Sequence, residues 1–288
     1  MLLPHSNLLS DVEAFVKKEL STHYSSGEIE HFCQYLFEDF SEISKNDRLT
    51  KKKIYIPESE IIKYSNAIQK LKRAMPIQYI VGKANFYGFD FFVDKSVLIP
   101  RPETEELAEW ICQELVAIPE AKILDIGTGS GCIPIVLAKK HQKLRITAVD
   151  ISHDALKVAT KNADFHQANI KFMQADALKP SSLPHEKFDI IVSNPPYVRD
   201  SEKSSMHKNV MDYEPHLALF VDDNDPLIFY KNIAEYAFQH LSKNGKLFFE
   251  INEALGKEYQ ELLTKIGYKN IEIKKDLRGK ERMICGEL

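Results

Sequence analysis

Short apolar runs alternate with helical stretches from residue 121 onward, and this alternation restricts the possible folds more than any other feature of the chain. Strands that alternate with helices form a mostly parallel sheet with helices on its faces. The last two runs are separated only by a short turn, so we expect them to pair antiparallel. The expected strands are AKILDI, LRITAV, IKFMQA, FDIIVS, KLFFEI, 269–275 and 281–286, and the expected helices are 132–140, 153–166, 227–241 and 254–266. The sequence therefore predicts an α/β domain built on a mostly parallel sheet with an antiparallel end.

The first eighty residues have a different pattern, in which apolar residues recur at steps of three and four. This spacing predicts amphipathic helices. Ser10 and Glu13 are spaced as a capping box, which would start a helix near residue 10, and Pro57 would start another helix that runs to about Ala74. No group of side chains here suggests chemistry, so we interpret residues 1–80 as a small helical bundle for substrate recognition or support.

A segment rich in aromatic and β-branched residues separates these two parts of the chain. Residues 85–99 contain Gly88 and predict a hairpin, and a helix is expected at about 103–117. We therefore divide the chain into a helical domain at 1–80, a hairpin linker at 81–102 and an α/β domain at 103–288.

The composition argues against several classes of protein. The formal net charge is −4, so the chain lacks the positive field of a general nucleic-acid binder. Lys51-Lys52-Lys53 is the only compact basic run, and we interpret it as a solvated loop. The four cysteines form no C-x-x-C pair, which argues against a disulfide framework or zinc site and favours a reducing cytoplasm. The first residues become acidic too early for a signal peptide, and no apolar run approaches about 18 residues, so we expect no signal peptide and no membrane association.

A glycine loop lies between the first expected strand of the α/β domain and the helix that follows it. In an open α/β sheet, ligands bind at the carboxyl ends of the strands, and glycines let the backbone approach a ligand closely. A dinucleotide site needs G-x-G-x-x-G, but Cys132 occupies the third glycine position. The loop instead resembles the D-x-G-x-G-x-G loop of class I S-adenosylmethionine-dependent methyltransferases, and a tight turn without a ligand is the alternative. The residues expected to bind the cofactor are Gly127, Thr128, Gly129, Ser130 and Gly131.

Two acidic residues follow the next two strands. Asp150 ends the second strand, where a carboxylate can accept hydrogen bonds from both ribose hydroxyls of a nucleoside. Asp176 follows the third strand, where a side chain that contacts adenine is expected, and a helix cap is the alternative interpretation. Both residues are therefore candidate cofactor ligands.

The tetrapeptide Asn194-Pro195-Pro196-Tyr197 follows the fourth strand. Two prolines fix the backbone and end the ladder of hydrogen bonds, so that carbonyl groups remain free to accept from a ligand. Asn194 offers a carbonyl acceptor, and Tyr197 offers an aromatic face. Together they predict a clamp for a planar –NH2 group whose nitrogen faces a cofactor, so Asn194 is expected beside both ligands. The alternative is a rigid turn.

The chemistry follows from the weak nucleophilicity of such a nitrogen, whose lone pair is delocalised into the neighbouring π-system. A general base is not obviously needed, because the proton becomes acidic only as the new C–N bond forms. In-line placement beside an activated methyl group, with acceptors aimed at the N–H groups, would supply the catalysis. Such a site needs no metal ion.

Taken together, these motifs resemble the protein-(glutamine-N5) methyltransferases that modify class-1 peptide chain release factors. The resemblance covers nearly the whole chain and implies a class I methyltransferase domain, Rossmann-like with a seven-stranded sheet, after a helical domain and a hairpin. It is found at residues 76–82, 86–88, 97–105, 125–131, 194–197, 214–215 and 218–219. It implies that S-adenosylmethionine donates a methyl group to the glutamine of a Gly-Gly-Gln tip. We expect a cytoplasmic monomer with no stable nucleic-acid partner.

The resemblance also implies roles for particular residues. The glycine loop and Asp150 would hold the cofactor, and residues 194–197 would grip the glutamine. Arg101 and Glu103 lie in a segment that is close to the active site in the family, so they are candidates for shaping it, and a charged linker is the alternative. Asn252 and Pro226 stand where the family usually has glycine, and neither is expected to touch the two signature motifs.

Three other functions remain as alternatives. A DNA or RNA adenine-N6 methyltransferase could use the same clamp for an exocyclic amine, although such an enzyme usually clusters Lys and Arg for phosphate binding. A glutamine methyltransferase that acts on a ribosomal protein shares the logic of the motifs. A cofactor-binding module without catalysis is disfavoured, because Asn194 and Tyr197 are both present.

Overall fold

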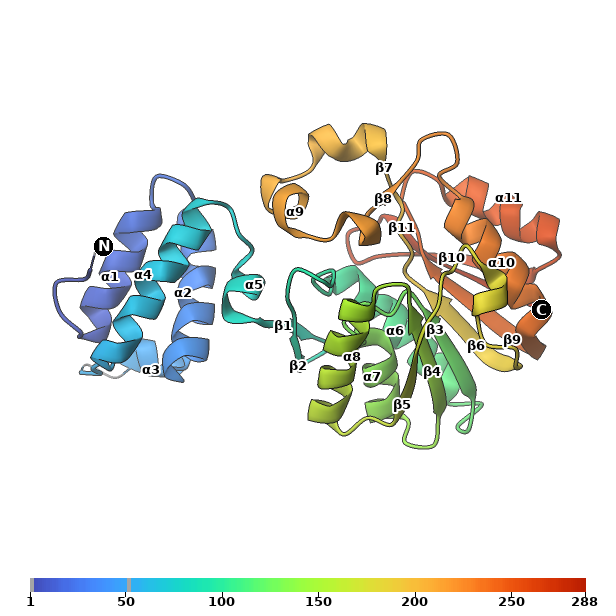
Figure 1. Ribbon diagram of the computed structural model, residues 1–288, viewed down its shortest axis with the longest axis horizontal. Helices are drawn as coiled ribbons and strands as arrows, with labels where there is room; N and C mark the ends of the chain where they lie inside the picture. The colour runs from blue at the N-terminus through green and yellow to red at the C-terminus, as the bar shows by residue number, and fades with distance from the viewer. Residues whose placement is uncertain (1–2, 51–52) are drawn as a thin grey trace. The chain divides into compact units, whose positions relative to one another are not determined.

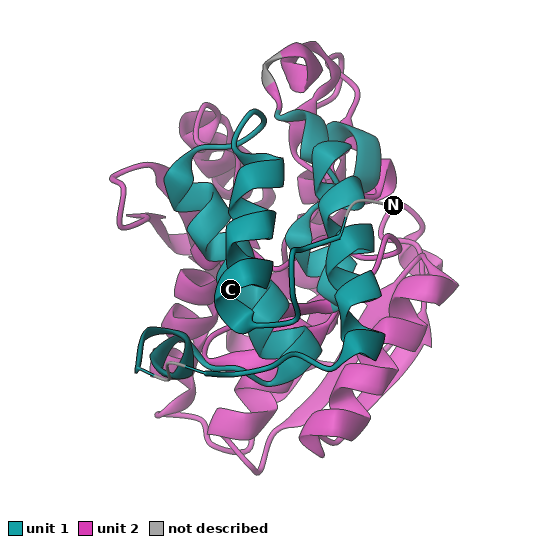
Figure 2. Cartoon of the chain, turned by 90° about the vertical axis from the view of Figure 1, so that its left-hand side faces the viewer, with its two compact units in different colours: residues 1–82, 207–213 teal, residues 83–206, 214–288 magenta. Residues whose placement is uncertain are grey.

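The computed structural model describes residues 3–50 and 53–288, so Lys51 and Lys52 of the basic run lie outside the described residues. Two compact units make up the chain, residues 1–82 with 207–213 and residues 83–206 with 214–288 (Figure 2). The hairpin that was expected to be a linker falls in the second unit, and the short segment 207–213 falls in the first.

The first unit is a bundle of helices, as the three- and four-residue spacing predicts. Its long helices are α1 (Leu9–Leu20), α2 (Ser26–Ser41) and α4 (Glu58–Lys72), and its short ones are α3 (Lys45–Thr50), α5 (Ile77–Val81) and α9 (Lys208–Tyr213). The apolar stripes meet in one core that includes Val16, Leu36 and Phe37. The Tyr213 hydroxyl donates to the Arg73 carbonyl oxygen at 2.8 Å, which ties α9 to the end of α4.

The predicted capping box at Ser10 and Glu13 is wrong. Helix α1 is capped by Leu8, whose side chain forms no cap hydrogen bond, and Leu9 N–H instead donates to the Ile54 carbonyl oxygen at 2.9 Å. A backbone bridge between Leu8 and Tyr55 therefore fixes the start of this helix, and Ser10 lies one residue inside it. The bundle does contain a capping box, which is formed by Ser25 and Glu28 at the start of α2.

The second unit begins with the hairpin of β1 (Lys83–Phe86) and β2 (Phe89–Phe92), which is shorter than the predicted segment 85–99. Its two turn residues, Tyr87 and Gly88, both have positive φ angles of 55° and 77°. This backbone matches the twist of the two strands. Phe86 and Phe91 are fully buried in a core shared with the following helix α6 (Pro102–Leu115), so the hairpin is anchored to the α/β unit.

A seven-stranded sheet forms the centre of the second unit, which confirms the predicted fold class (Figure 1). The strand order is β10-β11-β9-β6-β3-β4-β5, and only the pairs made by β11 are antiparallel. The strands are β3 (Lys122–Ile126), β4 (Arg145–Asp150), β5 (Ile170–Gln174), β6 (Phe188–Ser193), β9 (Leu241–Glu250), β10 (Lys269–Lys275) and β11 (Glu281–Glu287).

Helices cover both faces of this sheet and bury two separate cores. One core contains residues of α6, α7 (Cys132–Lys140) and α8 (His153–His166), and the other contains residues of α10 (Ile228–His240) and α11 (Gly256–Ile266). The remaining short elements are η1 (Pro180–Ser182), β7 (Val198–Arg199), η2 (Asp200–Ser205), η3 (His216–Ala218) and β8 (Phe220–Val221). Because β3, β4, β6 and β9 are parallel, the residues that follow them meet at one edge of the sheet.

Within the described part of the chain, no helix is both long and apolar enough to cross a membrane. Among the same residues, no three His, Cys, Asp or Glu side chains gather in a way that could hold a metal ion. The four cysteines are buried and free.

Candidate functional site

A cavity of about 260 Å³ opens at the carboxyl edge of the parallel strands in the second unit. Most of the candidate residues line it, although they come from segments far apart in the sequence. Those that line it are Arg101, Gly127, Thr128, Gly129, Ser130, Asp150, Asp176, Asn194, Pro195 and Pro196. Three candidates, Glu103, Gly131 and Tyr197, lie outside the lining.

The glycines of the loop between β3 and α7 serve two different purposes. Gly127 and Gly129 have φ angles of 77° and 54°, and a Cβ atom on either would meet no atom within 4 Å. Gly131 also has a positive φ, but a Cβ there would approach the Cβ of Ala159 and the Cδ1 of Ile135 to 3.2 Å each. Gly127 and Gly129 therefore leave open space at the cavity, whereas Gly131 allows α7 and α8 to pack closely.

Asp150 is held at the cavity by backbone donors. Its Oδ2 accepts from Gly129 N–H and its Oδ1 from Ser152 N–H, both at 2.9 Å. Burial raises the pKa of this carboxyl, while the backbone hydrogen bonds lower it. The carboxylate is thus fixed in orientation beside the glycine loop, and each oxygen retains capacity to accept from a ligand hydroxyl.

Asp125, near the end of β3, is a charged residue that the sequence motifs did not single out as a site residue. It is completely buried, and neither carboxylate oxygen has a hydrogen-bond partner among the described residues. The neighbouring Thr128 hydroxyl forms no hydrogen bond of normal geometry there, but it lies close enough to Asp125 to lower the pKa of its carboxyl. Burial raises the pKa of Asp125 to about 7. A buried carboxylate without donors is costly, and it marks a position where positive charge would be favourable.

Asp176 lines the cavity but also stabilises its own turn. Its Oδ1 accepts from Leu178 N–H at 2.9 Å, and its Oδ2 lies 3.3 Å from Lys179 Nζ. Asp176 does not cap a helix, because the next helix, η1, has Lys179 at its N-cap. The side chain of Asp176 lies at the cavity, and its role toward the cofactor stays a prediction.

The amide of Asn194 is oriented by a contact from α6. Its Nδ2 donates to the Thr104 Oγ1 at 3.3 Å, and no described residue donates to its Oδ1. The preceding Ser193 Oγ donates to the Ile126 carbonyl oxygen at 2.6 Å, which ties the end of β6 to β3. Pro195 and Pro196 complete this wall of the cavity.

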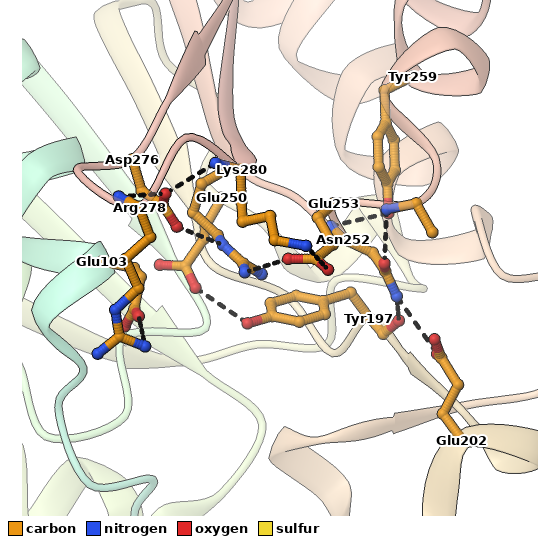
Figure 3. A network of polar contacts seen from close by, with 12 residues as sticks. Glu103, Tyr197, Glu202, Glu250, Asn252, Glu253, Tyr259, Asp276, Arg278 and Lys280 are labelled. Atoms are coloured by element: carbon orange, nitrogen blue, oxygen red, sulfur yellow. Dashed lines mark hydrogen bonds and ion pairs between the residues drawn. The ribbon is translucent and has the colours of Figure 1, made fainter. Parts of the chain in front are cut away.

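Tyr197 is not among the residues that line the cavity, so the expected role of its ring as a face for the substrate stays a prediction. Its hydroxyl donates to the Glu250 Oε1 at 3.1 Å (Figure 3). Burial and the Glu250 charge raise the pKa of Tyr197 well above its usual range. Tyr197 therefore anchors the tetrapeptide to the end of β9.

The two residues of the RPETE segment are placed differently from one another. Arg101 lines the cavity, and its Nη2 lies 2.6 Å from the Oε1 of the buried Glu214. Glu103 is outside the lining, with its Oε1 3.8 Å from the Nη1 of the exposed Arg278 (Figure 3). Only Arg101 is thus in a position to shape the cavity directly.

Asn252 does touch a signature motif, so the expectation that it would not is wrong. Its Nδ2 lies 3.2 Å from the Tyr197 carbonyl oxygen and 3.3 Å from the Glu202 Oε2 (Figure 3). The contact arises because Asn252 follows β9, whose end lies beside the end of β6 in the sheet. Asn252 therefore supports the backbone of the tetrapeptide from behind.

The fold and this site define a class I methyltransferase. Residues 104–216 match the Methyltransferase small domain family, and residues 14–82 match the PrmC N-terminal domain family. The catalytic domain of hMettl16, solved in complex with MAT2A 3'UTR hairpin 6, shares the fold with a TM-score of 0.56, at 15% identity over 88% of this chain and 91% of that chain.

The comparison with curated relatives identifies the family. The release factor glutamine methyltransferase of Flavobacterium psychrophilum is 47% identical over 268 residues, which cover 92% of this chain and 94% of the relative. That of Bacteroides thetaiotaomicron is 39% identical over 277 residues, which cover 96% and 99%. The chain belongs to the release factor glutamine methyltransferase family.

Proposed function

We propose that this enzyme transfers a methyl group from S-adenosylmethionine to the side-chain nitrogen (N5) of the glutamine in the Gly-Gly-Gln motif of class-1 peptide chain release factors. The observation that carries the proposal is the orientation of Asn194, whose Oδ1 lacks a donor among the described residues while its Nδ2 is engaged by Thr104. A primary amide offers two N–H donors to such an acceptor.

The residues around the glycine loop fit the cofactor. Gly127 and Gly129 leave open space beside the cavity, and the oriented carboxylate of Asp150 suits a pair of ribose hydroxyls. Asp125 places a carboxylate without donors beneath the loop, which suits a ligand that carries positive charge. Asp176, Thr128 and the other loop residues would complete the site. When bound, S-adenosylmethionine supplies an activated methyl group on a sulfonium.

The chain's own contribution to the reaction is orientation. The Asn194 Oδ1 would accept from one N–H of the glutamine, and carbonyl oxygens of the rigid Pro195-Pro196 segment would accept from the other. Fixing a weak nucleophile in line with its electrophile removes much of the entropic barrier, and acceptors aimed at the increasingly acidic N–H groups stabilise the transition state. Arg101, held by Glu214, would shape the entrance.

A direct assay tests the proposal against its alternatives. The enzyme is incubated with S-adenosylmethionine labelled in the methyl group and with purified release factor, ribosomal protein or adenine-containing DNA or RNA in parallel. Mass spectrometry then locates the label. We expect label on the glutamine of the release factor and none on nucleic acid. Label on adenine, or on a ribosomal protein alone, would contradict the proposal.

We propose further that the helical unit contributes to recognition of the protein substrate. The described residues that line the cavity all belong to the second unit, so the bundle has no part in that lining. Deletion of residues 1–75 should therefore impair methylation of intact release factor more than it weakens S-adenosylmethionine binding, as measured by calorimetry. Normal kinetics on intact release factor would contradict this role.

A further inference from the structure

The side-chain amide of Asn194 has two ends of opposite polarity, and only one of them suits the proposed substrate. The Oδ1 end accepts hydrogen bonds, whereas the Nδ2 end donates two. A glutamine –NH2 group is a donor, so Asn194 must present Oδ1 to it. An asparagine free to rotate by 180° about its last bond would present the wrong end part of the time.

The hydroxyl of Thr104 contacts only the Nδ2 end of the Asn194 amide. The Thr104 Oγ1 donates to the Glu250 Oε2 at 2.6 Å and accepts from the Asn194 Nδ2 at 3.3 Å. A hydroxyl has a single proton. Because that proton is committed to Glu250, the side of Thr104 that faces Asn194 carries only lone pairs, and they match Nδ2 and not Oδ1.

Glu250 determines in turn where the Thr104 proton points. This residue ends β9 and is 1% exposed. Its other oxygen, Oε1, accepts from the Tyr197 hydroxyl at 3.1 Å (Figure 3). Burial raises the pKa of Glu250 overall, and the hydrogen bonds from Thr104 and Tyr197 and the charge of Arg282 oppose that rise. In both contacts the neighbour is the donor, with the Thr104 hydroxyl donating to Oε2 and the Tyr197 hydroxyl to Oε1, so the carboxylate of Glu250 accepts from both.

We propose that Glu250 and Thr104 are positioning residues that hold the Asn194 amide with its oxygen toward the substrate, and thereby select a primary amide over a carboxylate. The inference rests on the proposed function. It adds a determinant of specificity that lies outside the tetrapeptide. The two residues that form this determinant, Thr104 and Glu250, are 146 positions apart in the sequence.

The Glu250→Gln variant tests this because it preserves size while reversing one hydrogen bond. In this variant the introduced side chain can still accept from Tyr197 through its oxygen, and its –NH2 group donates to Thr104. The Thr104 proton is then free to point at Asn194, which favours the flipped amide. The opposite orientation of the introduced amide would leave the Tyr197 hydroxyl proton without an acceptor in a buried site, which is costly.

Two readouts separate a flipped amide from a general structural defect. We expect kcat for release factor to fall by about 100-fold, comparable to the loss of one preorganised transition-state hydrogen bond. We also expect a release factor with glutamate in place of the motif glutamine to inhibit Glu250→Gln about 10-fold more strongly than the wild type, because the flipped Asn194 offers donors to a carboxylate. A merely structural defect would weaken inhibition as well as turnover.

Three further variants complete the experiment. Thr104→Ser keeps the hydroxyl and should retain most of the activity, whereas Thr104→Val removes it and should lower kcat. Glu114→Gln is the matched control. The Glu114 Oε2 lies 2.6 Å from the Lys246 Nζ, and neither residue lines the cavity. This variant should leave kcat and inhibition unchanged. Calorimetry measures the affinity of the wild type and of each variant for S-adenosylmethionine.

The outcomes distinguish the two proposals. Absence of release-factor methylation by the wild type would overturn the proposed function and this inference with it. An active wild type together with Glu250→Gln of unchanged kcat, or with weaker inhibition by the glutamate form, would overturn the inference alone.

Discussion

The two sides of the cavity are built in different ways. On the side where we propose that the cofactor binds, called the cofactor side, a glycine loop and an aspartate are fixed by the backbone, with Gly129 N–H donating directly to Asp150. On the side where we propose that the glutamine binds, called the substrate side, the tetrapeptide is fixed by side chains, since Thr104 and Tyr197 both donate to the buried Glu250. The first arrangement needs open space beside the main chain, and the second needs a definite direction for each proton.

The two constructions should tolerate different substitutions. A site made of backbone groups depends on φ angles and on the absence of Cβ atoms. A site made of linked side chains depends on every donor and acceptor in the chain of contacts, because each one fixes the next. We expect changes on the cofactor side to alter affinity, and changes on the substrate side to alter turnover.

Asn194→Ala should produce the largest effect and is the first test of this division. Removal of the oriented acceptor should lower kcat for release factor by at least about 100-fold, as loss of a preorganised transition-state contact does. Binding of S-adenosylmethionine, measured by calorimetry, should change little, because the loop and Asp150 are untouched. Unchanged turnover would refute the role of Asn194, and a parallel loss of cofactor affinity would break the division between the two sides.

The fold and the position of the glycine loop and Asp150 at the cavity were largely predictable, because their signals are local in sequence. The alternation of strands and helices gave the sheet and its antiparallel end, and β3, the glycines and the helix after them are contiguous, so spacing alone indicated a ligand loop. Asp150 could be placed because it ends the next strand. The roles of the individual glycines were not predictable, because the clash at Gly131 depends on Ala159 of another helix.

The support of the tetrapeptide was less accessible from the sequence. Thr104, Glu250 and Asn252 meet residues 194–197 only because β9 pairs with β6 and α6 packs beside them. The contact of the Tyr197 hydroxyl with Glu250 was not predicted, because the motif indicated only a role for the aromatic ring. The sequence did contain one indication of this support. Glu250 is an acidic residue at the end of the apolar strand β9, and a buried carboxylate requires hydrogen-bond donors. The capping error at Ser10 has the same origin, a tertiary contact that overrides a local pattern.

Asp150→Ala tests the cofactor side next. Loss of the oriented carboxylate should weaken S-adenosylmethionine binding by about 1–3 kcal/mol, the range for hydrogen bonds to a charged group. The kcat at saturating cofactor should fall much less than in Asn194→Ala. Calorimetry and saturation kinetics measure the two quantities, and an unchanged affinity would remove Asp150 from the cofactor site.

Asp125→Asn probes the buried charge beneath the loop through the pH dependence of stability. Burial raises the folded pKa of Asp125 to about 7, above its ordinary value. The folded state therefore favours the protonated form, so this stability is present at low pH and is lost as the pH rises through about 7. Between pH 5.5 and 8 the wild type without cofactor should lose about 2 kcal/mol more unfolding free energy than Asp125→Asn.

Denaturant titrations at the two pH values measure this difference. The same substitution should weaken S-adenosylmethionine binding, since it removes a negative charge from beneath the loop. Equal pH dependence in the two proteins would show that Asp125 is not the group responsible.

Gly131→Ala and Gly127→Ala should show the smallest effect, and they separate packing from ligand space within a single loop. The two glycines have φ angles of 79° and 77°, so an alanine at either position carries nearly the same backbone strain. Only at position 131 does the new Cβ meet neighbours at 3.2 Å. Gly131→Ala should therefore be less stable than Gly127→Ala by about 1 kcal/mol in unfolding free energy, the lower range for overpacking.

Gly127→Ala should lose more cofactor affinity, because its Cβ extends into open space beside the cavity. If both variants lost the same stability and the same cofactor affinity, the separate roles of Gly131 in packing and of Gly127 in leaving space for the ligand would be refuted.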